Sequence, residues 1–396
     1  MSELDLARIR AETPGCGRVI HLNNCGAGLM PAPVLDALTG HLQLEAEIGG
    51  YEASDAAEAA QERSYDAIAG MLNCHRDEVA VVENATVAWD MAFYGLPMQP
   101  GDVVLTAVSE YASNAIAYLQ RRRRDGIEVR VVPNDGDGQL DVAALAGMID
   151  DRVKLISVTH VPTNGGLINP AAAIGRVARD AGIPFLLDAC QSAGQVPLDV
   201  EAIGCDLLSA TGRKYLRGPR GTGFLYVRQS LLERLEPPFL DLHSATWVAA
   251  DRYEMLPNAR RFENWENYVA GKVGLGVAVD YAVDLGLEAI AARVQALADG
   301  LRRDMAALPG VAVHDLGREK SGIVSFSVAG QSPDAVKAAM AAAGINISTS
   351  GVVSTRYDME ARGIEAMNRL GVHYYNSEDE LARFLEVLAS LPAGRV

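Results

Sequence analysis

Short apolar runs alternate with alanine-rich helical patterns between about residues 79 and 227, and this alternation constrains the fold more than any other feature. Each run is bounded by glycine, proline or polar residues, which is typical of strands buried on both faces of a parallel sheet. We therefore predict an α/β fold in which helices such as Ala171–Asp180 cover both faces of a mostly parallel, seven-stranded sheet. The seven runs are Val79–Val82, Val103–Ala107, Val129–Val132, Leu155–Thr159, Phe185–Leu187, Leu207–Ser209 and Gly223–Val227.

The pattern changes after Phe262. A stretch with few helix breakers runs from Val273 to Met305, and shorter strand and helix patterns follow it. We expect a large domain at residues 20–270 and a smaller α+β domain formed by residues 1–19 and 285–396. One long helix around residues 271–305 should join them. The expected strands of the small domain are Val311–Asp315, Gly322–Val328 and Ile345–Ser350, and its expected helices are Ser332–Ala343 and Ser377–Leu391.

Lys214 stands out because the chain has only five lysines and uses arginine for most of its positive charge. It lies in a turn rich in arginine and glycine between two predicted strands. An ε-amine can lose its proton and form a Schiff base with an aldehyde, whereas a guanidinium remains protonated. The alternative is an ordinary surface lysine.

Asp188 ends the predicted strand that precedes this turn, 214 − 188 = 26 residues before the lysine. The carboxyl ends of parallel strands face the ligand crevice, and a buried carboxylate there requires a cationic partner. A protonated pyridine nitrogen is such a partner. The pair Asp188 and Lys214 therefore predicts pyridoxal 5'-phosphate as the cofactor, with the acid on the ring nitrogen and the lysine on the aldehyde.

Eight segments between His21 and about Phe384 strengthen this prediction by their order. They are His21–Gly28, Glu83–Val87, Ser109–Asn114, Thr159–Gly166, Asp188–Gln191, Thr211–Lys214, Arg261–Glu263 and Arg369–Asn376. Together they resemble the class V aminotransferase and cysteine desulfurase family of fold-type I pyridoxal phosphate enzymes. Three segments are most similar to carbon–sulfur lyases and to isopenicillin N epimerase-like members: Glu45–Tyr51, Gly212–Gly223 and Arg261–Tyr268.

The resemblance implies a set of cofactor contacts beyond Asp188 and Lys214. The helix start at Ala85 and Thr86 should bind the phosphate, because unpaired backbone N–H groups suit an anion there; the alternative for Thr86 is an ordinary N-cap. Tyr111 matches a position that stacks on the ring, although a strand-end aromatic also suits a core. The remaining implied contacts are Thr163, Gln191 as a donor to the ring hydroxyl, Thr211, Arg213, and Asn267 from a neighbouring subunit.

Arg369 matches the arginine that binds the substrate carboxylate in relatives, where a guanidinium fork fits a carboxylate. A surface salt bridge is the alternative. Arg356, Asn24 and Tyr51 are further expected substrate contacts, and Asn164 could replace Thr163.

Cysteine desulfurases carry a nucleophilic cysteine on a small-domain loop, but this chain has no cysteine after Cys205. We therefore expect β-elimination of a carbon–sulfur lyase type through an external aldimine, with Lys214 removing the α-proton. An epimerase, an aminotransferase and a non-catalytic cofactor-binding protein remain alternatives. Cys25 and Cys190 lie near the expected site on different elements.

The composition excludes several other classes. A formal net charge of −16 argues against nucleic acid and anionic membranes as partners. The five cysteines show neither metal-type spacing nor a disulfide framework, and the N-terminus has no secretory pattern. We expect a cytoplasmic protein without a metal whose substrate is a small molecule, an amino acid, and the resemblance implies a homodimer with shared active sites.

Overall fold

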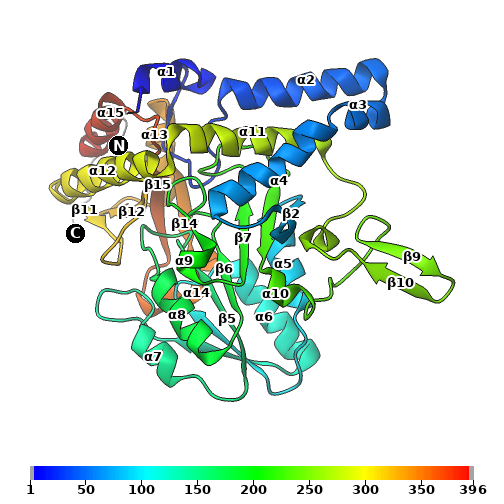
Figure 1. Cartoon of the computed structure of the whole chain (residues 1–396). Helices are drawn as coiled ribbons and strands as arrows, with labels where there is room; N and C mark the ends of the chain where they lie inside the picture. The colour runs from blue at the N-terminus through cyan, green and yellow to red at the C-terminus, as the bar shows by residue number, and fades with distance from the viewer. Residues whose placement is uncertain (1–3, 392–396) are drawn as a thin grey trace.

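The computed structural model describes residues 4–391 and contains a seven-stranded sheet with the order β2-β8-β7-β6-β5-β3-β4 (Figure 1). Only β8 runs against its neighbours, so the predicted mostly parallel sheet is confirmed. Each predicted run lies on its own strand. The strands are β2 Val79–Val82, β3 Val103–Ala107, β4 Glu128–Val132, β5 Val153–Thr159, β6 Phe185–Asp188, β7 Leu207–Thr211 and β8 Gly223–Val227.

Helices cover both faces of this sheet. Trp89 of α5 and Tyr118 of α6 belong to the core on one face, while Ile68 of α4, Ile174 of α8 and Leu275 of α11 belong to the core on the other. This packing buries the strands on both sides, as their continuous apolar sequences predict. The helices of this region are α4 Glu58–Leu72, α5 Ala85–Gly95, α6 Ala112–Asp125, α7 Val142–Gly147, α8 Ala171–Ala181, α9 Val200–Ile203 and α10 Gln229–Leu232.

The expected single helix around residues 271–305 is two helices. Helix α11 spans Val269–Leu285 and α12 spans Leu287–Ala306. Gly286 between them has φ of 90°, a left-handed conformation that glycine adopts without a steric penalty. The turn redirects the chain, so α11 packs on α2 and α4 whereas α12 packs beside α15.

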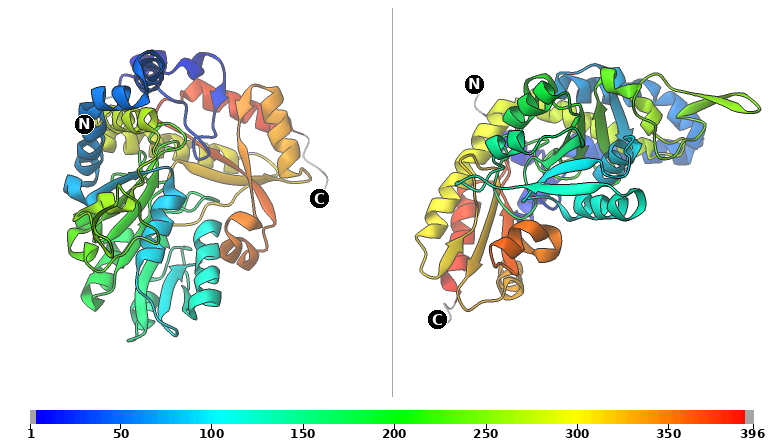
Figure 2. Two further views of the ribbon diagram at one scale, coloured as in Figure 1. Left: turned by 90° about the vertical axis from the view of Figure 1, so that its right-hand side faces the viewer. Right: turned by 90° about the horizontal axis from the view of Figure 1, so that it is seen from below.

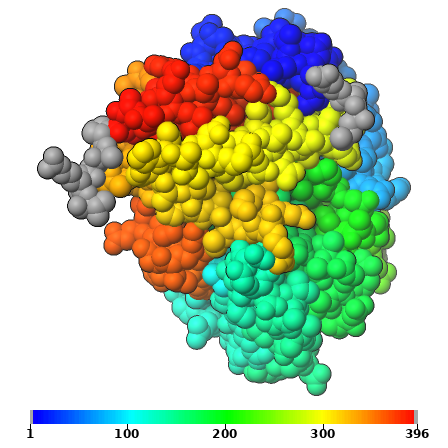
Figure 3. Space-filling model, turned by 90° about the vertical axis from the view of Figure 1, so that its left-hand side faces the viewer, coloured from blue at the N-terminus to red at the C-terminus, as the bar shows by residue number. Residues whose placement is uncertain are grey.

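The C-terminal part contains a four-stranded antiparallel sheet with the order β11-β12-β15-β14 and its own apolar core. Figure 3 shows α15 and α12 side by side on one face of the molecule, with the N-terminal helices above them. The N-terminal residues Ile9 and Leu22 join this core. The elements are β11 Val311–Val313, β12 Ile323–Val328, α13 Pro333–Ala342, β13 Ile345–Asn346, β14 Ser348–Gly351, α14 Arg356–Ala361, β15 Ala366–Gly371 and α15 Glu378–Ser390.

A hairpin of β9 and β10 projects from the body of the protein (Figure 2). Its exposed face carries Trp247 and Tyr253, which are 77% and 50% exposed. No helix within residues 4–391 is long and apolar enough to cross a membrane. The remaining elements are α1 Leu6–Ala11, β1 Ile20–His21, α2 Ala32–Ile48, α3 Gly50–Ala56, β9 Ala245–Ala249 and β10 Arg252–Met255.

Candidate active site

Lys214 lies in the turn that links β7 to the antiparallel strand β8, at the carboxyl edge of the parallel strands. The N-terminal segment packs directly against this turn, because the N–H of Gly28 donates to the carbonyl of Arg213 at 2.8 Å. A Cβ at Gly28 would lie 2.6 Å from the carbonyl oxygen of Lys214, so the approach requires glycine. Arg217, in the middle of the same turn, has φ of 60° and a fully buried side chain. The backbone around the lysine is therefore held from two sides.

The electrostatic surroundings of Lys214 favour its neutral form. Burial lowers the pKa of the amine, and the nearby Arg213 and Arg369 lower it further. Asp188 and Cys190 act in the opposite direction without reversing the shift. A neutral amine is the form that attacks an aldehyde and that accepts a proton.

This shift predicts a pH dependence for cofactor capture by the apoprotein. Because the neutral amine reacts, the capture rate should rise with pH and reach half its maximum below about 10.4, the pKa of a free lysine. The visible absorption band of the bound cofactor measures the rate. A midpoint at or above the free-lysine value would contradict the inferred environment.

Asp188, at the end of β6, is 5% exposed, and its carboxylate accepts hydrogen bonds from neutral groups. Its Oδ2 accepts a hydrogen bond from Asn114 Nδ2 at 3.1 Å, and its Oδ1 accepts one from the N–H of Cys190 at 2.9 Å. Within residues 4–391, no arginine, lysine or histidine forms an ion pair with it. A buried carboxylate of this kind fits a protonated ring nitrogen.

Glu110 and Asn114 support Asp188, and the sequence analysis gave them no role. Asn114 Nδ2 also donates to Glu110 Oε1 at 2.9 Å, so one amide joins the two carboxylates. Glu110 accepts further hydrogen bonds from Thr106 at 2.7 Å and Thr159 at 2.5 Å, and burial raises the pKa of its carboxyl. Glu110 precedes the N-cap Tyr111 of α6 and Asn114 lies in its first turn, so no helical spacing in the sequence pairs the two residues.

Arg369, on β15, reaches the large sheet from the smaller one. Its Nη1 donates to the Thr163 carbonyl at 2.5 Å and to Thr163 Oγ1 at 2.6 Å, and its Nε donates to Ser348 Oγ at 3.2 Å. Its positive charge helps to lower the pKa of Lys214, so the guanidinium lies near the amine. No carboxylate pairs with Arg369 in the described chain, which leaves this guanidinium suited to an anionic ligand.

The expected phosphate cradle at Ala85 and Thr86 lies at the start of α5. Asn84 is the N-cap and accepts from the N–H of Val87 at 3.0 Å, so Thr86 is not the cap and its side chain is exposed. Gly223 of β8 approaches closely, since a Cβ there would lie 2.9 Å from the nitrogen of Ala85. Free N–H groups at this helix start suit a phosphate.

Thr211 and Arg213 come from the neighbouring strand β7 and its turn. Thr211 Oγ1 donates to the carbonyl of Thr222 at 3.3 Å, and the guanidinium of Arg213 donates to the carbonyl of Gly26. Tyr111 precedes α6 and is 37% exposed, so it does not belong to a core. Its position beyond the strand end leaves its ring available for stacking.

Gln191 departs from the role predicted for it. Its Nε2 already donates to the carbonyl of Cys25 at 3.0 Å, whereas its buried Oε1 has no partner within residues 4–391. The free atom is therefore an acceptor, which a ring hydroxyl could satisfy by donating. The orphaned Gln191 oxygen and the unpaired Asp188 carboxylate both fit pyridoxal phosphate.

Three expected contacts have their side chains engaged elsewhere within the described residues. Asn24 is fully buried and its amide donates to the carbonyl of Gly371 at 2.7 Å, so it joins the N-terminal segment to β15. The oxygen of Asn24 accepts from Tyr375, which leaves no free polar atom for a substrate. Arg356 is exposed and pairs with Glu360 on its own helix. Asn164 donates to Asp358 at 2.7 Å and so does not replace Thr163.

Tyr51 and Asn267 line a separate cavity of about 470 Å³ together with His243 and Trp265. Tyr51 is 74% exposed, and Asn267 is exposed as well. Neither side chain contacts Lys214 or Asp188 in the described chain.

Residues 20–384 match the family model of class V aminotransferases. The chain belongs to the class V aminotransferase family. A probable cysteine desulfurase of Xylella fastidiosa (strain 9a5c) is 30% identical to it over 97% of this chain and 95% of that protein. The apo structure of a cysteine desulfurase from Thermococcus onnurineus NA1 is 26% identical with a TM-score of 0.90, each chain being 98% covered.

A second solved structure bears on the cofactor. A lysine-to-alanine mutant of C-DES with glycine covalently linked to its pyridoxal phosphate is 25% identical to this chain, with a TM-score of 0.87 over 97% of this chain and 99% of that one. This member of the class V family is a pyridoxal phosphate-dependent enzyme with the α/β fold of these structures. No group of three or more metal-ligating side chains occurs within residues 4–391.

Proposed function

We propose that this enzyme cleaves a carbon–sulfur bond of an amino acid by β-elimination, without storing the sulfur on a cysteine of its own. The relatives are named cysteine desulfurases, which supports sulfur-containing amino acids as the substrate class. The observation that carries the elimination is the absence of any cysteine after Cys205. A desulfurase-like nucleophile would be expected in the small-domain loops.

The two cysteines near the site do not supply such a nucleophile. Cys190 follows Asp188 by two residues, and burial together with the charge of Asp188 raises the pKa of its thiol. Because the thiolate is the reactive form, this thiol is a poor sulfur acceptor. Cys25 is buried at 1% exposure and packs in an apolar cluster with Val161 and Ile323.

The roles of the residues follow from their positions. When bound, pyridoxal phosphate supplies an aldehyde for the substrate amine and a ring that withdraws electrons from the α-carbon. Arg369 would bind the substrate carboxylate, Lys214 in its neutral form would take the α-proton, and Asp188 would hold a proton on the ring nitrogen. The electron pair of the breaking bond then leaves with sulfur. The start of α5 with Thr211 and Arg213 would hold the phosphate, Tyr111 would stack on the ring, and Gln191 would face its hydroxyl.

Residues 20–270 are proposed as the cofactor domain, and residues 1–19 and 285–396 as a smaller domain that carries Arg369 to the site. Two separate apolar cores support this division. The N-terminal residue Ile9 lies in the smaller core although it precedes the large sheet.

A homodimer with shared sites is proposed because Tyr51 and Asn267 line a surface cavity that does not include Lys214. Exposed aromatic and apolar side chains line this cavity or are sequence neighbours of its lining residues, namely Tyr51, Leu242, Trp265 and Tyr268. A cluster of this kind is typical of an interface. We expect a dimer in analytical ultracentrifugation, with a two-fold axis that brings Asn267 to the partner's phosphate site. A catalytically active monomer would contradict this proposal.

Product analysis tests the reaction. Incubation with cysteine, cystine and cysteine S-conjugates should yield pyruvate, ammonia and a sulfur-containing leaving group. Racemised substrate would instead indicate an epimerase, a keto acid that retains the side chain would indicate an aminotransferase, and alanine would indicate desulfuration. Any of these three as the main product overturns β-elimination.

Replacement of Arg369 by alanine should weaken substrate binding by about 2–5 kcal/mol, because the buried carboxylate of the substrate would lose its charged partner. KM should rise in steady-state assays, while the visible band of the bound cofactor stays unchanged. Arg356→Ala is the matched control, since Arg356 is exposed and pairs with Glu360. Unchanged affinity in the Arg369 variant with weakened affinity in the Arg356 variant would place the carboxylate at Arg356.

A further inference from the structure

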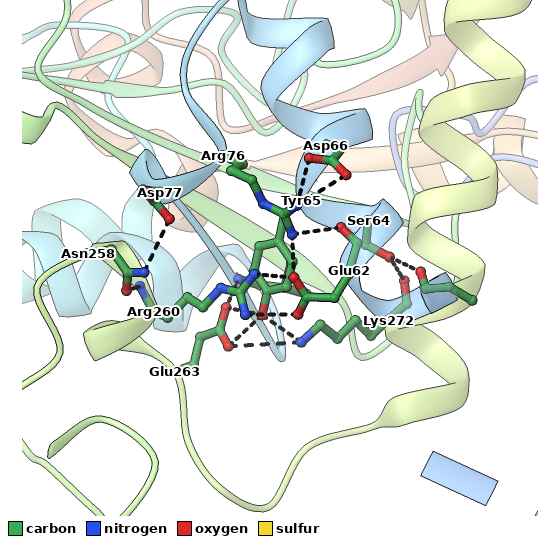
Figure 4. A network of polar contacts seen from close by, with 12 residues as sticks. Glu62, Ser64, Tyr65, Asp66, Arg76, Asp77, Asn258, Arg260, Glu263 and Lys272 are labelled. Carbon is green, nitrogen blue, oxygen red and sulfur yellow. Dashed lines mark hydrogen bonds and ion pairs between the residues drawn. The ribbon is translucent and has the colours of Figure 1, made fainter. Parts of the chain in front are cut away.

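Both ends of the loop 264–268 are tied to one hydroxyl group, that of Tyr65 on α4. Glu263 precedes the loop, and each of its carboxylate oxygens lies 2.8 Å from the Tyr65 oxygen. Lys272, in the first turn of α11 after the loop, donates from Nζ to the same oxygen at 2.6 Å. Figure 4 shows the three side chains converging between α4 and α11.

The Tyr65 group is buried and fully paired. Tyr65 is 0% exposed and Glu263 is 5% exposed. Glu263 also accepts from the N–H of Val81 at 2.7 Å, which fixes it to β2, and its other oxygen lies 3.1 Å from His243 Nε2. Because Lys272 Nζ is 4.0 Å from the carboxylate, the hydroxyl mediates between the two charges.

The ring of Tyr65 is held as firmly as its hydroxyl. The guanidinium of Arg260 lies 3.8 Å from the ring centroid and the ammonium of Lys272 lies 4.5 Å from it. Arg260 in turn pairs with Glu62 at 2.7 Å. Burial raises the pKa of Tyr65, so the hydroxyl keeps its proton and donates to Glu263. Burial also lowers the pKa of Lys272.

The side chains of residues 265–268 are exposed, whereas Asn264 donates to Glu83 Oε1 at 3.3 Å. Trp265 is 49% exposed and Tyr268 is 42% exposed, and both Trp265 and Asn267 line the cavity that contains Tyr51. Among residues 4–391, the one hydrogen bond of the Asn267 side chain is its donation to the carbonyl of Trp265, at 3.0 Å. The loop therefore has a buried anchor on one side and an outward-facing amide on the other.

We propose that Tyr65 is a positioning residue for the active site of the partner subunit: its hydroxyl sets the position of loop 264–268, and the loop presents Asn267 to the partner's cofactor phosphate. This inference rests on the proposed homodimer with shared sites. Tyr65 touches neither cofactor nor substrate. Replacing Tyr65 should consequently weaken cofactor binding in the other subunit. A purely structural role of Tyr65 within its own subunit would not have this effect.

Hybrid dimers with two different affinity tags test the inference. Each hybrid contains one Lys214→Ala subunit, so only one lysine-dependent visible band can form and it reports one known site. In the first hybrid, Tyr65→Phe is placed in the subunit that keeps Lys214. In the second, Tyr65→Phe is placed in the Lys214→Ala subunit, whose loop would serve the intact lysine. Cofactor affinity is measured by titration of the visible band with pyridoxal phosphate.

The second hybrid should bind the cofactor roughly ten- to a hundredfold more weakly, because misplacement of a contact by about an ångström has effects of this order. The first hybrid should match the parent hybrid without the tyrosine change. The opposite pattern, or equal weakening in both arrangements, overturns the inference. Tyr226→Phe is the matched control, since Tyr226 is fully buried and its hydroxyl has no partner within residues 4–391.

Two further hybrids separate this inference from the proposal beneath it. Asn267→Ala in the Lys214→Ala subunit should weaken binding as well, and if it does not, the shared site itself fails and the role of Tyr65 with it. If Asn267→Ala weakens binding and Tyr65→Phe does not, the shared site stands and only the inference is overturned. Should the Tyr65 variant not fold, Lys272→Met removes the donor that joins α11 to the Tyr65 hydroxyl. It should likewise weaken cofactor binding only when placed in the Lys214→Ala subunit.

Discussion

Replacing Lys214 with alanine should abolish the lysine-dependent visible band and lower turnover by roughly 10²- to 10⁴-fold or more, since proton transfer by a positioned side chain contributes on this scale. The effect is large because one amine has two tasks. It attaches the cofactor, and it is the neutral base beside the α-carbon. Burial and two nearby arginines lower its pKa and so prepare it for both.

Borohydride reduction of the holoenzyme followed by peptide mapping measures the first task. The pyridoxyl group should be found on Lys214 and nowhere else. Lys154→Ala is the control variant, because Lys154 is exposed and donates only to the carbonyl of Asp151 at 2.6 Å. It should keep both the visible band and the activity. A label on another lysine would refute the assignment of the site.

The large sheet was predictable because its strands are continuous apolar runs with turn residues at both ends. Val79–Val82, Val103–Ala107 and Gly223–Val227 match their strands residue for residue. Strand β15 was missed, since Ala366–Gly371 contains Asn368 and Arg369 and has no apolar run. Its pairing with β12 and β14 is a tertiary effect that local sequence does not encode.

The break at Gly286 shows a different limit. A single glycine within a helical pattern is tolerated in many helices, so the sequence alone favoured one long helix. Packing of α11 against α2 and α4, and of α12 beside α15, requires the chain to change direction there. Only the left-handed φ of Gly286 makes that turn.

The sequence predicted those active-site residues whose type is required by the cofactor chemistry and whose position follows the end of a strand. Asp188 and Lys214 are of this kind. The hydrogen-bond partners were less predictable, because Gln191, Thr163 and Asn24 can each donate or accept in several directions. The structure fixes those directions. The amide of Gln191 donates to the carbonyl of Cys25. The amide of Asn24 donates to the carbonyl of Gly371, and its oxygen accepts from Tyr375. A role for Tyr65 has no local signature, as its partners are about two hundred residues away in sequence.

Replacing Asp188 with asparagine should lower kcat by roughly 10²- to 10³-fold, the scale on which loss of one electrostatic stabiliser acts. The amide removes the negative charge that would hold a proton on the ring nitrogen. Its single oxygen can keep only one of the two hydrogen bonds that Asp188 accepts, from Asn114 or from the N–H of Cys190. The absorbance of the bound cofactor should shift in this variant, whereas it should stay in place in Arg369→Ala.

Glu110→Gln is the informative comparison for Asp188→Asn. It removes a second buried charge that Asn114 joins to Asp188, yet leaves the carboxylate of Asp188 intact. We expect a smaller loss of kcat and a smaller spectral shift in the same direction, because Glu110 acts on the ring only through Asp188. If Asp188→Asn left both kcat and the spectrum unchanged, Asp188 would not face the ring nitrogen. The buried carboxylate at the end of β6 would then need another cation.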